Sequence, residues 1–210
     1  MVSTRVRGPA YRIQTQRLIL RCWEPRDAPL LKEAIDNSLD HLRPWMPWAA
    51  DEPEALQDKI TRLRNWRGQF DLGKEFVYAI FGLEEQRVLG SCGLHTRVGP
   101  EAREIGYWIH ADHINKGLAT EAAGALARIA FEVDGVVRVE IHCDPDNVRS
   151  SAVARKLGFA HEATLRARAV DCQGKRRDSM IWTLLRDEYR RSELRDIAIQ
   201  AWDAAGRRIL

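Results

Sequence analysis

The chain has 210 residues, of which 45% are hydrophobic and 30% charged, and its net charge at pH 7 is +3. This composition excludes a disordered chain, and so small a net charge gives no ground for expecting nucleic-acid binding. The four cysteines form no CxxC pair, no apolar run reaches the roughly 20 residues that span a bilayer, and the start, residues 1–12, is polar and basic. We therefore expect a cytoplasmic protein with no signal peptide, membrane segment or metal site.

In chain order, residues 17–23 predict a strand, and Pro25 and Asp27 open a short helix. The segment 41–53 holds three prolines and two tryptophans, so we expect a loop there. Apolar residues at helical spacing predict a helix over 54–68. Strands are predicted over the ranges 75–81, 87–97 and 103–110.

The period then changes to that of a helix, with apolar residues from Leu118 to Val133. Alternation over 138–143 predicts a strand, and a short helix over 147–157 ends at Gly158. Two more strands are predicted over 159–170 and 175–185, before an amphipathic helical tail over 186–210. This order is typical of an α/β or α+β fold, which we expect to form a single domain over 1–210 with its core at about 15–185.

The most informative segment runs from a predicted strand through a loop with Gly117 into a helix. Backbone amides at a helix start lack partners within the helix, and the helix dipole makes the site attractive to a phosphate. Gly117 allows close approach, and Lys116 adds charge. The alternative is that Gly117 only makes a turn and Thr120 only caps the helix. Neither a Walker nor a Rossmann glycine motif is present.

A second strand-to-helix junction follows at residues 142–159, where Asn147 and Ser150 begin a helix. Taken alone, Asn147 is better explained as an N-cap, with Ser150 as its reciprocal partner. Two such junctions on adjacent strands, however, define a cleft. This pairing favours a binding site over two unrelated caps.

Several motifs resemble those of one enzyme group. INKGLA at 114–119 is similar to an acyl-CoA loop that reads [QR]xxGx[GA], although Ile114 replaces Gln or Arg. Glu104 to Ile109 matches ExGYWI, and Asn147 to Phe159 matches NxxSxxVxxKxGF. Together with TQRLILR at 15–21 and HLRPWMPW at 41–48, these motifs resemble the GNAT superfamily of acyl-CoA-dependent N-acetyltransferases, in the branch of the RimJ/RimL ribosomal-protein alanine acetyltransferases.

The resemblance implies a GNAT-like mixed, mostly antiparallel sheet of about seven strands, splayed at its centre and flanked by helices. It implies acetyl-CoA as co-substrate, with the pantetheine arm between the strands 103–110 and 138–143. Asn147 would hydrogen-bond this arm. The other residues implied to bind acetyl-CoA are Trp108, Ile109, His110, Asn115, Lys116, Gly117, Leu118, Ala119 and Thr120.

The resemblance also implies direct attack of an amine on the thioester in a ternary complex. Ser150 would protonate the leaving thiolate, and Glu104 would accept the proton of the amine. Glu104 could instead be an ion-paired strand carboxylate. His142 is a weaker candidate base, and Cys143 a weaker candidate for a covalent intermediate.

Trp45 and Trp48 either cover the core or border the acceptor pocket, as the resemblance implies. A basic cluster on the last hairpin either faces solvent or guides an acidic acceptor or ribosomal RNA; it comprises Arg166, Arg168, Lys175, Arg176 and Arg177. We expect acetylation of a protein or peptide N-terminus. The alternatives are acetylation of a small amine, such as an antibiotic, amino acid or polyamine, and a non-catalytic acyl-CoA-binding module. A homodimer is an expectation from similar enzymes.

Overall fold

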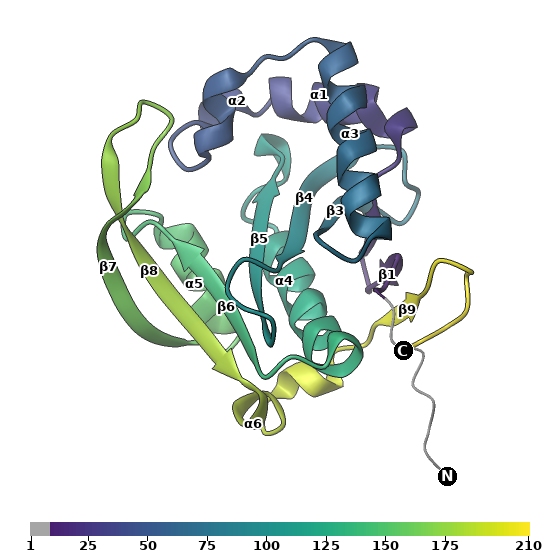
Figure 1. Ribbon diagram of the computed structural model, residues 1–210, viewed down its shortest axis with the longest axis vertical. Helices are drawn as coiled ribbons and strands as arrows, with labels where there is room; N and C mark the ends of the chain where they lie inside the picture. Colours follow the sequence, from purple (N-terminus) through teal and green to yellow (C-terminus); the bar gives the residue numbers. More distant parts are fainter. Residues whose placement is uncertain (1–8) are drawn as a thin grey trace.

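The computed structural model describes residues 9–210, so most of the polar start predicted not to be a signal peptide lies outside the described part. The described chain forms a nine-stranded sheet in the order β7-β8-β6-β5-β4-β3-β2-β1-β9 (Figure 1). The strands are β1 (Arg12–Gln14), β2 (Leu18–Cys22), β3 (Phe76–Gly82), β4 (Val88–His95), β5 (Ala102–Ile109), β6 (Arg138–Cys143), β7 (Ala160–Val170), β8 (Arg176–Leu185) and β9 (Gln200–Trp202).

Helices cover both faces of this sheet (Figure 1). They are α1 (Ala28–Asp36), α2 (Leu39–Leu42), α3 (Leu56–Asp71), α4 (Leu118–Ile129), α5 (Val148–Lys156) and α6 (Arg186–Tyr189). Within residues 9–210, none of them combines the length and apolar character that a bilayer-spanning helix requires.

The sheet is mixed and mostly antiparallel, as predicted, and it splays at its centre. Among residues 9–210, β5 and β6 form the one parallel pair. Their pairing stops at Glu104 and Glu140, although β5 continues to Ile109 and β6 to Cys143. The two strands therefore separate toward their carboxyl ends, which confirms the predicted splay.

Two apolar clusters lie on opposite faces of the sheet. On one face, α4 and α5 bury side chains such as Leu126 and Val153 against Ile105 of β5. On the other, α1 and α3 pack through residues such as Leu31 around Trp108 of β5. Because successive strand residues point to opposite faces, β5 presents one set of side chains to each cluster.

The edge of the sheet and the tail differ from the prediction. The predicted strands correspond to β2–β8, while β1 and β9 pair with each other and extend the sheet at one edge. The helical tail over 186–210 is wrong beyond residue 196, because only α6 and a 3-10 turn at Glu193–Asp196 are helical before β9. The tail does pack on the body: a Cβ on Gly124 of α4 would lie 2.9 Å from Ile197 Cδ1.

The predicted loop at 41–53 is also partly helical. It begins within α2, and Pro47–Asp51 forms a 3-10 turn. Lys59 of α3, which is fully buried, forms ion pairs with Glu52 and Glu54 just after this turn. These ion pairs hold the segment between α2 and α3 against α3.

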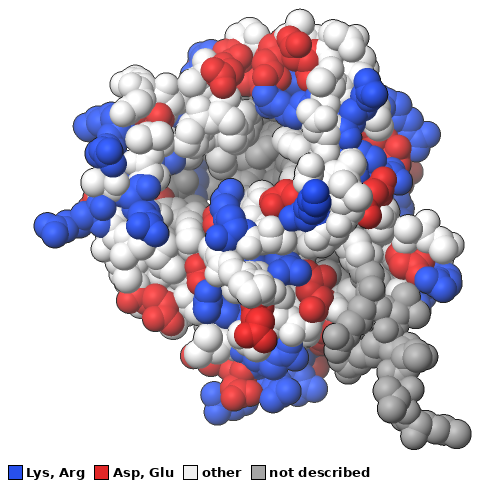
Figure 2. Space-filling model, viewed as in Figure 1, with Lys and Arg blue, Asp and Glu red and all other residues white. Residues whose placement is uncertain are grey.

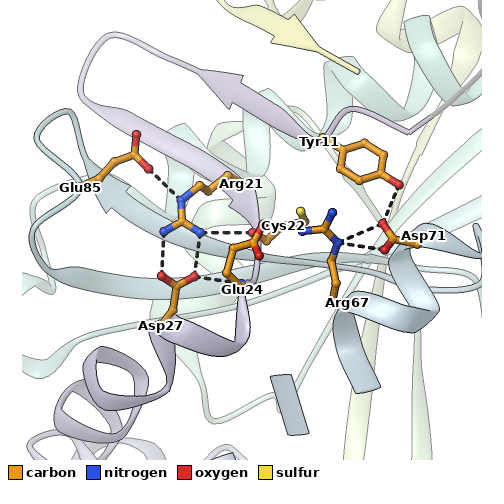
Figure 3. Close-up of polar contacts among 8 residues, drawn as sticks. All are labelled: Tyr11, Arg21, Cys22, Glu24, Asp27, Arg67, Asp71 and Glu85. Carbon is orange, nitrogen blue, oxygen red and sulfur yellow. Dashed lines mark hydrogen bonds and ion pairs between the residues drawn. The ribbon is translucent and has the colours of Figure 1, made fainter. Parts of the chain in front are cut away.

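Two polar networks fasten α1 and α3 to the sheet (Figure 3). Arg21 of β2 donates two hydrogen bonds to Asp27 (2.7 and 2.9 Å) and one to Glu85 (2.7 Å). Nearby, Asp71 of α3 accepts a hydrogen bond from the Tyr11 hydroxyl (2.8 Å) and pairs with Arg67. The start of α1 is thereby held over the face that carries Trp108, while the end of α3 is held at Tyr11, where Phe70 joins the apolar cluster of the opposite face.

Candidate functional site

A cavity of about 1060 Å³ opens where β5 and β6 separate. Its walls come from the segment between α1 and α3, from β5 and β6, and from the first turns of α4 and α5. Figure 2 shows the surface hollowed here, beneath the helices α1 to α3 of Figure 1. The lining runs from Ile35 to Arg177, so segments far apart in the sequence build the site together.

The start of α4 forms one wall of the cavity. Gly117 precedes the helix with a left-handed φ of 77°, which favours glycine. The N–H of Glu121 donates to Gly117 O (3.0 Å), which is the first hydrogen bond of the helix. The N–H groups of Leu118, Ala119 and Thr120 come before it and therefore have no acceptor within the helix. These three residues, Gly117 and Asn115 all line the cavity. With the positive end of the helix dipole, this wall is suited to bind an anion.

This helix start is braced from outside by Arg17, for which the sequence alone suggested no role. Its Nη1 donates to Lys116 O (2.9 Å), and its Nε donates to Glu121 Oε2 (2.6 Å). The Thr15 hydroxyl donates to the other oxygen of Glu121 (2.5 Å). Residues 15–17 therefore support the loop before α4, although the two segments are about a hundred residues apart in the sequence. No local sequence pattern reveals such a contact.

Two of the predicted acetyl-CoA ligands lie outside the cavity wall. The His110 N–H donates to Leu89 O (2.8 Å), and its ring accepts a hydrogen bond from Asp112 N (3.1 Å). The Lys116 ammonium donates to Asp112 O (2.8 Å). The other predicted ligands, together with Ser150, Glu104, Trp45 and Trp48, do line the cavity.

The start of α5 places a hydroxyl pair in the wall next to α4. Asn147 caps the helix, because its side-chain oxygen accepts the Ser150 N–H (3.1 Å). The Ser150 hydroxyl lies 2.9 Å from the hydroxyl of Tyr107 on β5. Burial raises the pKa of Tyr107 well above its usual value, although the hydrogen bond with Ser150 opposes this shift. Tyr107 is therefore protonated at neutral pH, and this contact was missed because Ser150 lies 43 residues away.

Cys143 lies close to this pair but is a poor nucleophile. Burial raises the pKa of its thiol, against an opposing hydrogen-bond contribution from Ser150. Since the thiolate is the reactive form, a raised pKa disfavours a covalent intermediate on Cys143.

Glu104 faces the other side of β5 and is 5% exposed. Arg97 donates to both of its oxygens, with Nε 2.7 Å from Oε2, and His142 Nδ1 lies 3.6 Å from Oε2. Burial raises the pKa of Glu104, but the hydrogen bonds from Arg97 and the nearby charges outweigh it, so the pKa is lowered overall. Glu104 is thus ion-paired with Arg97 in this structure, and its role as the base stays a prediction.

Aromatic side chains surround the cavity on the same face as Glu104. The rings of Trp48 and Trp108 lie with their centroids 6.3 Å apart. Arg177 of β8 donates to the carbonyl oxygens of Trp45 (2.8 Å) and Pro44 (3.2 Å), across the mouth of the cavity. The rest of the predicted basic cluster on the β7–β8 hairpin is exposed.

His95 also lines this face, although it belongs to none of the sequence motifs. Its Nδ1 hydrogen-bonds to the Glu75 carboxylate. The ring lies over the cross-strand pair Gly93 and Gly106, since a Cβ on Gly106 would be 2.7 Å from Nε2. The two facing glycines were the only sequence signal that a ring could lie flat on the sheet here.

Comparison with known proteins agrees with this geometry. Residues 17–160 match the family model described as an acetyltransferase (GNAT) domain. The chain is 30% identical over 177 residues to YdaF of Bacillus subtilis (strain 168), a candidate ribosomal N-acetyltransferase, covering 83% of this chain and 94% of that protein. It is 28% identical over 168 residues to the ribosomal protein uS5-alanine N-acetyltransferase of Escherichia coli (strain K12), covering 77% of this chain and 84% of that protein.

A solved structure shares the fold. RimL, a ribosomal L7/L12 alpha-N-protein acetyltransferase in complex with coenzyme A, matches with a TM-score of 0.75 at 20% identity. The match covers 83% of this chain and 97% of that one. At this level of identity the likeness shows the architecture alone.

Proposed function

Because the chain belongs to the GNAT family of acetyltransferases, we propose that it transfers the acetyl group of acetyl-CoA to the N-terminal amine of a protein or peptide. The observation that carries this proposal is the cleft between β5 and β6. It has an anion-binding helix start on one side of the sheet and an aromatic pocket on the other. A phosphate-bearing thioester and an amine can therefore meet in the gap from opposite faces.

The donor binds on the α4 and α5 face. The amides from Gly117 to Thr120 hold the pyrophosphate, while Arg17 keeps the loop in place. The pantetheine arm lies between the separated strands, along Trp108 and Ile109. Asn147 hydrogen-bonds the arm.

The amine attacks the thioester carbonyl carbon directly, so the C–N bond forms as the C–S bond breaks. A backbone amide near Ile109 stabilises the oxyanion of the tetrahedral intermediate. Ser150 donates a proton to the leaving thiolate and is itself reprotonated from Tyr107 or solvent. Since a thiolate leaves readily, we expect this step to contribute less than the ~10²–10⁴-fold typical of general acids.

The acceptor binds on the α1 and α3 face, between Trp45, Trp48 and Trp108. Flat, rigid aromatic side chains suit the extended backbone of a peptide end. The relatives support this assignment, because one is named for acetylating an alanine of ribosomal protein uS5.

The test is acceptor-dependent release of free CoA from acetyl-CoA. The acceptors are peptides that carry ribosomal-protein N-termini, the same peptides with blocked N-termini, and a set of small amines. Ser150→Ala is compared with Ser151→Ala, a matched control whose hydroxyl donates to Val148 O (3.1 Å) within its own helix. Release with free but not blocked peptides, weakened in Ser150→Ala alone, supports the proposal.

Other outcomes separate the alternatives. Release with small amines alone would replace the peptide acceptor by a small molecule. CoA binding without any release would favour the non-catalytic binding module, and failure to bind CoA would overturn the proposal. Light scattering and cell fractionation test the remaining predictions, a homodimer and a cytoplasmic location.

A further inference from the structure

Direct attack requires a base, because the acceptor amine is mostly an ammonium ion at neutral pH. Glu104 is poorly suited to this role. Its two oxygens already accept hydrogen bonds from Arg97, which stabilise the deprotonated form. The side chain of Glu104 is 7% exposed, and a proton on it would weaken these charge-assisted hydrogen bonds from Arg97.

His95 has the arrangement that a base requires. Glu75 accepts the hydrogen bond from Nδ1–H, which leaves Nε2 of the neutral ring as the acceptor. Within residues 9–210, Nε2 has no hydrogen-bond partner, and the side chain is 20% exposed at the cavity wall. A carboxylate behind an imidazole fixes the tautomer and stabilises the imidazolium that forms.

The position of the ring is also favourable. Nε2 lies over Gly106, which is midway between Glu104 and Trp108 on the same face of β5. Two residues along a strand span about 6.6 Å, so Gly106 beneath Nε2 is one such step closer than the Cα of Glu104 to Trp108, along which the pantetheine arm is proposed to lie. The Ser150–Tyr107 pair is on the opposite face. A base and an acid would thus flank the gap between β5 and β6.

We propose that His95, oriented by Glu75, is the general base that deprotonates the acceptor amine, an inference that rests on the proposed function. The proton passes from the ammonium to Nε2, and the freed lone pair forms the C–N bond. As the C–S electrons leave with the thiolate, the nitrogen loses a second proton to solvent and becomes the neutral amide. The imidazolium then returns its proton to solvent. His95 is thereby assigned as a catalytic residue and Glu75 as a positioning residue.

Other charged groups face this part of the cavity and contribute to its pH dependence. Glu75, just before β3, touches the ring, Arg97 follows the end of β4, and Glu104 and His142 lie on β5 and β6. Arg62 of α3 and Arg177 of β8 line the cavity above them. The test therefore compares variants across a pH range.

The experiment measures kcat/KM for a peptide acceptor against pH in the wild type, His95→Gln, Glu75→Gln and Glu104→Gln. His161→Gln, an exposed change on β7, is the control. For His95→Gln we expect a loss of about 10²–10⁴-fold at neutral pH. The loss should shrink as the pH rises through about 8, where a peptide α-amine deprotonates by itself. Glu75→Gln should lower kcat less than His95→Gln does. Glu104→Gln should keep the same fall in kcat/KM toward acid pH as the wild type.

CoA affinity and thermal melting of His95→Gln distinguish catalysis from structure. Unchanged CoA affinity with the rate loss described supports the proposal. An active wild type with an equally active His95→Gln, or a loss that stays constant with pH, would overturn the base assignment alone. Loss of CoA binding in His95→Gln would make the residue structural and also overturn it. A wild type inactive with every acceptor would overturn the proposed function, and the base assignment with it.

Discussion

Gly106→Ala changes the acceptor face of the cleft by a single methyl group. Its Cβ would lie 2.7 Å from Nε2 and 3.2 Å from Cδ2 of His95. Ordinary contacts begin at 3.4 Å, so the ring must move by about 0.7 Å. The ring cannot tilt freely, because its Nδ1 is bonded to Glu75 on the other side.

The magnitude follows from this displacement. Overpacking by one methyl group costs typically about 1–3 kcal/mol of stability. A misplacement of about 1 Å in a catalytic site can cost about 10²-fold in rate. We therefore expect kcat to fall by about 10- to 100-fold, while acetyl-CoA affinity stays close to that of the wild type. The reason is that the proposed acetyl-CoA site lies on the other face of β5, away from the side chains of residue 106 and His95.

The assay is steady-state CoA release at saturating acetyl-CoA, with CoA affinity measured by calorimetry. The matched control is Gly82→Ala in β3, where a Cβ would make an ordinary contact at 3.8 Å with Leu89 Cδ1. A Gly106→Ala enzyme with wild-type kcat would refute the reasoning, since it would mean that the His95 ring is either free to move or unimportant.

Three further predictions concern the donor site and Glu104. Ser150→Ala should lower kcat by less than about 100-fold with unchanged CoA affinity, measured by stopped-flow thiol release; a loss of CoA binding would contradict its role as an acid. Gly117→Ala should cost about 1–2 kcal/mol from the left-handed φ of 77° and weaken CoA binding, measured by denaturation and calorimetry; unchanged affinity would argue against the phosphate cradle. Glu104 has a lowered pKa in the folded state, so its contribution to stability is present above its unfolded pKa and is lost as the pH falls through the folded value. The stability gap between wild type and Glu104→Gln should therefore be widest at neutral pH and close in acid, which urea titrations at several pH values will measure; a gap independent of pH would refute this linkage.

The elements determined by local chemistry were predictable from the sequence. Apolar runs and apolar alternation located β2–β8, helical spacing located α4, and Asn147 and Gly158 marked the ends of α5. The helix α4 starts at Gly117, which has a left-handed conformation, and α5 starts at Asn147, which caps it by accepting the N–H of Ser150 three residues later. Interactions of such short range leave a recognisable pattern in the sequence, so the two junctions and their roles as cleft walls could be proposed before the fold was known.

The sequence by itself thus determined the strands, the two helix starts and the family resemblance, whereas tertiary structure decided which side chains meet across the cleft. The short strands β1 and β9 carry too little pattern to be seen, and their pairing joins segments almost two hundred residues apart. Tyr107 meets Ser150, Glu75 meets His95 and Arg97 neutralises Glu104 only after the order of strands is set. Each of these contacts depends on the register and face of a strand, because a shift of one residue turns every side chain to the opposite face.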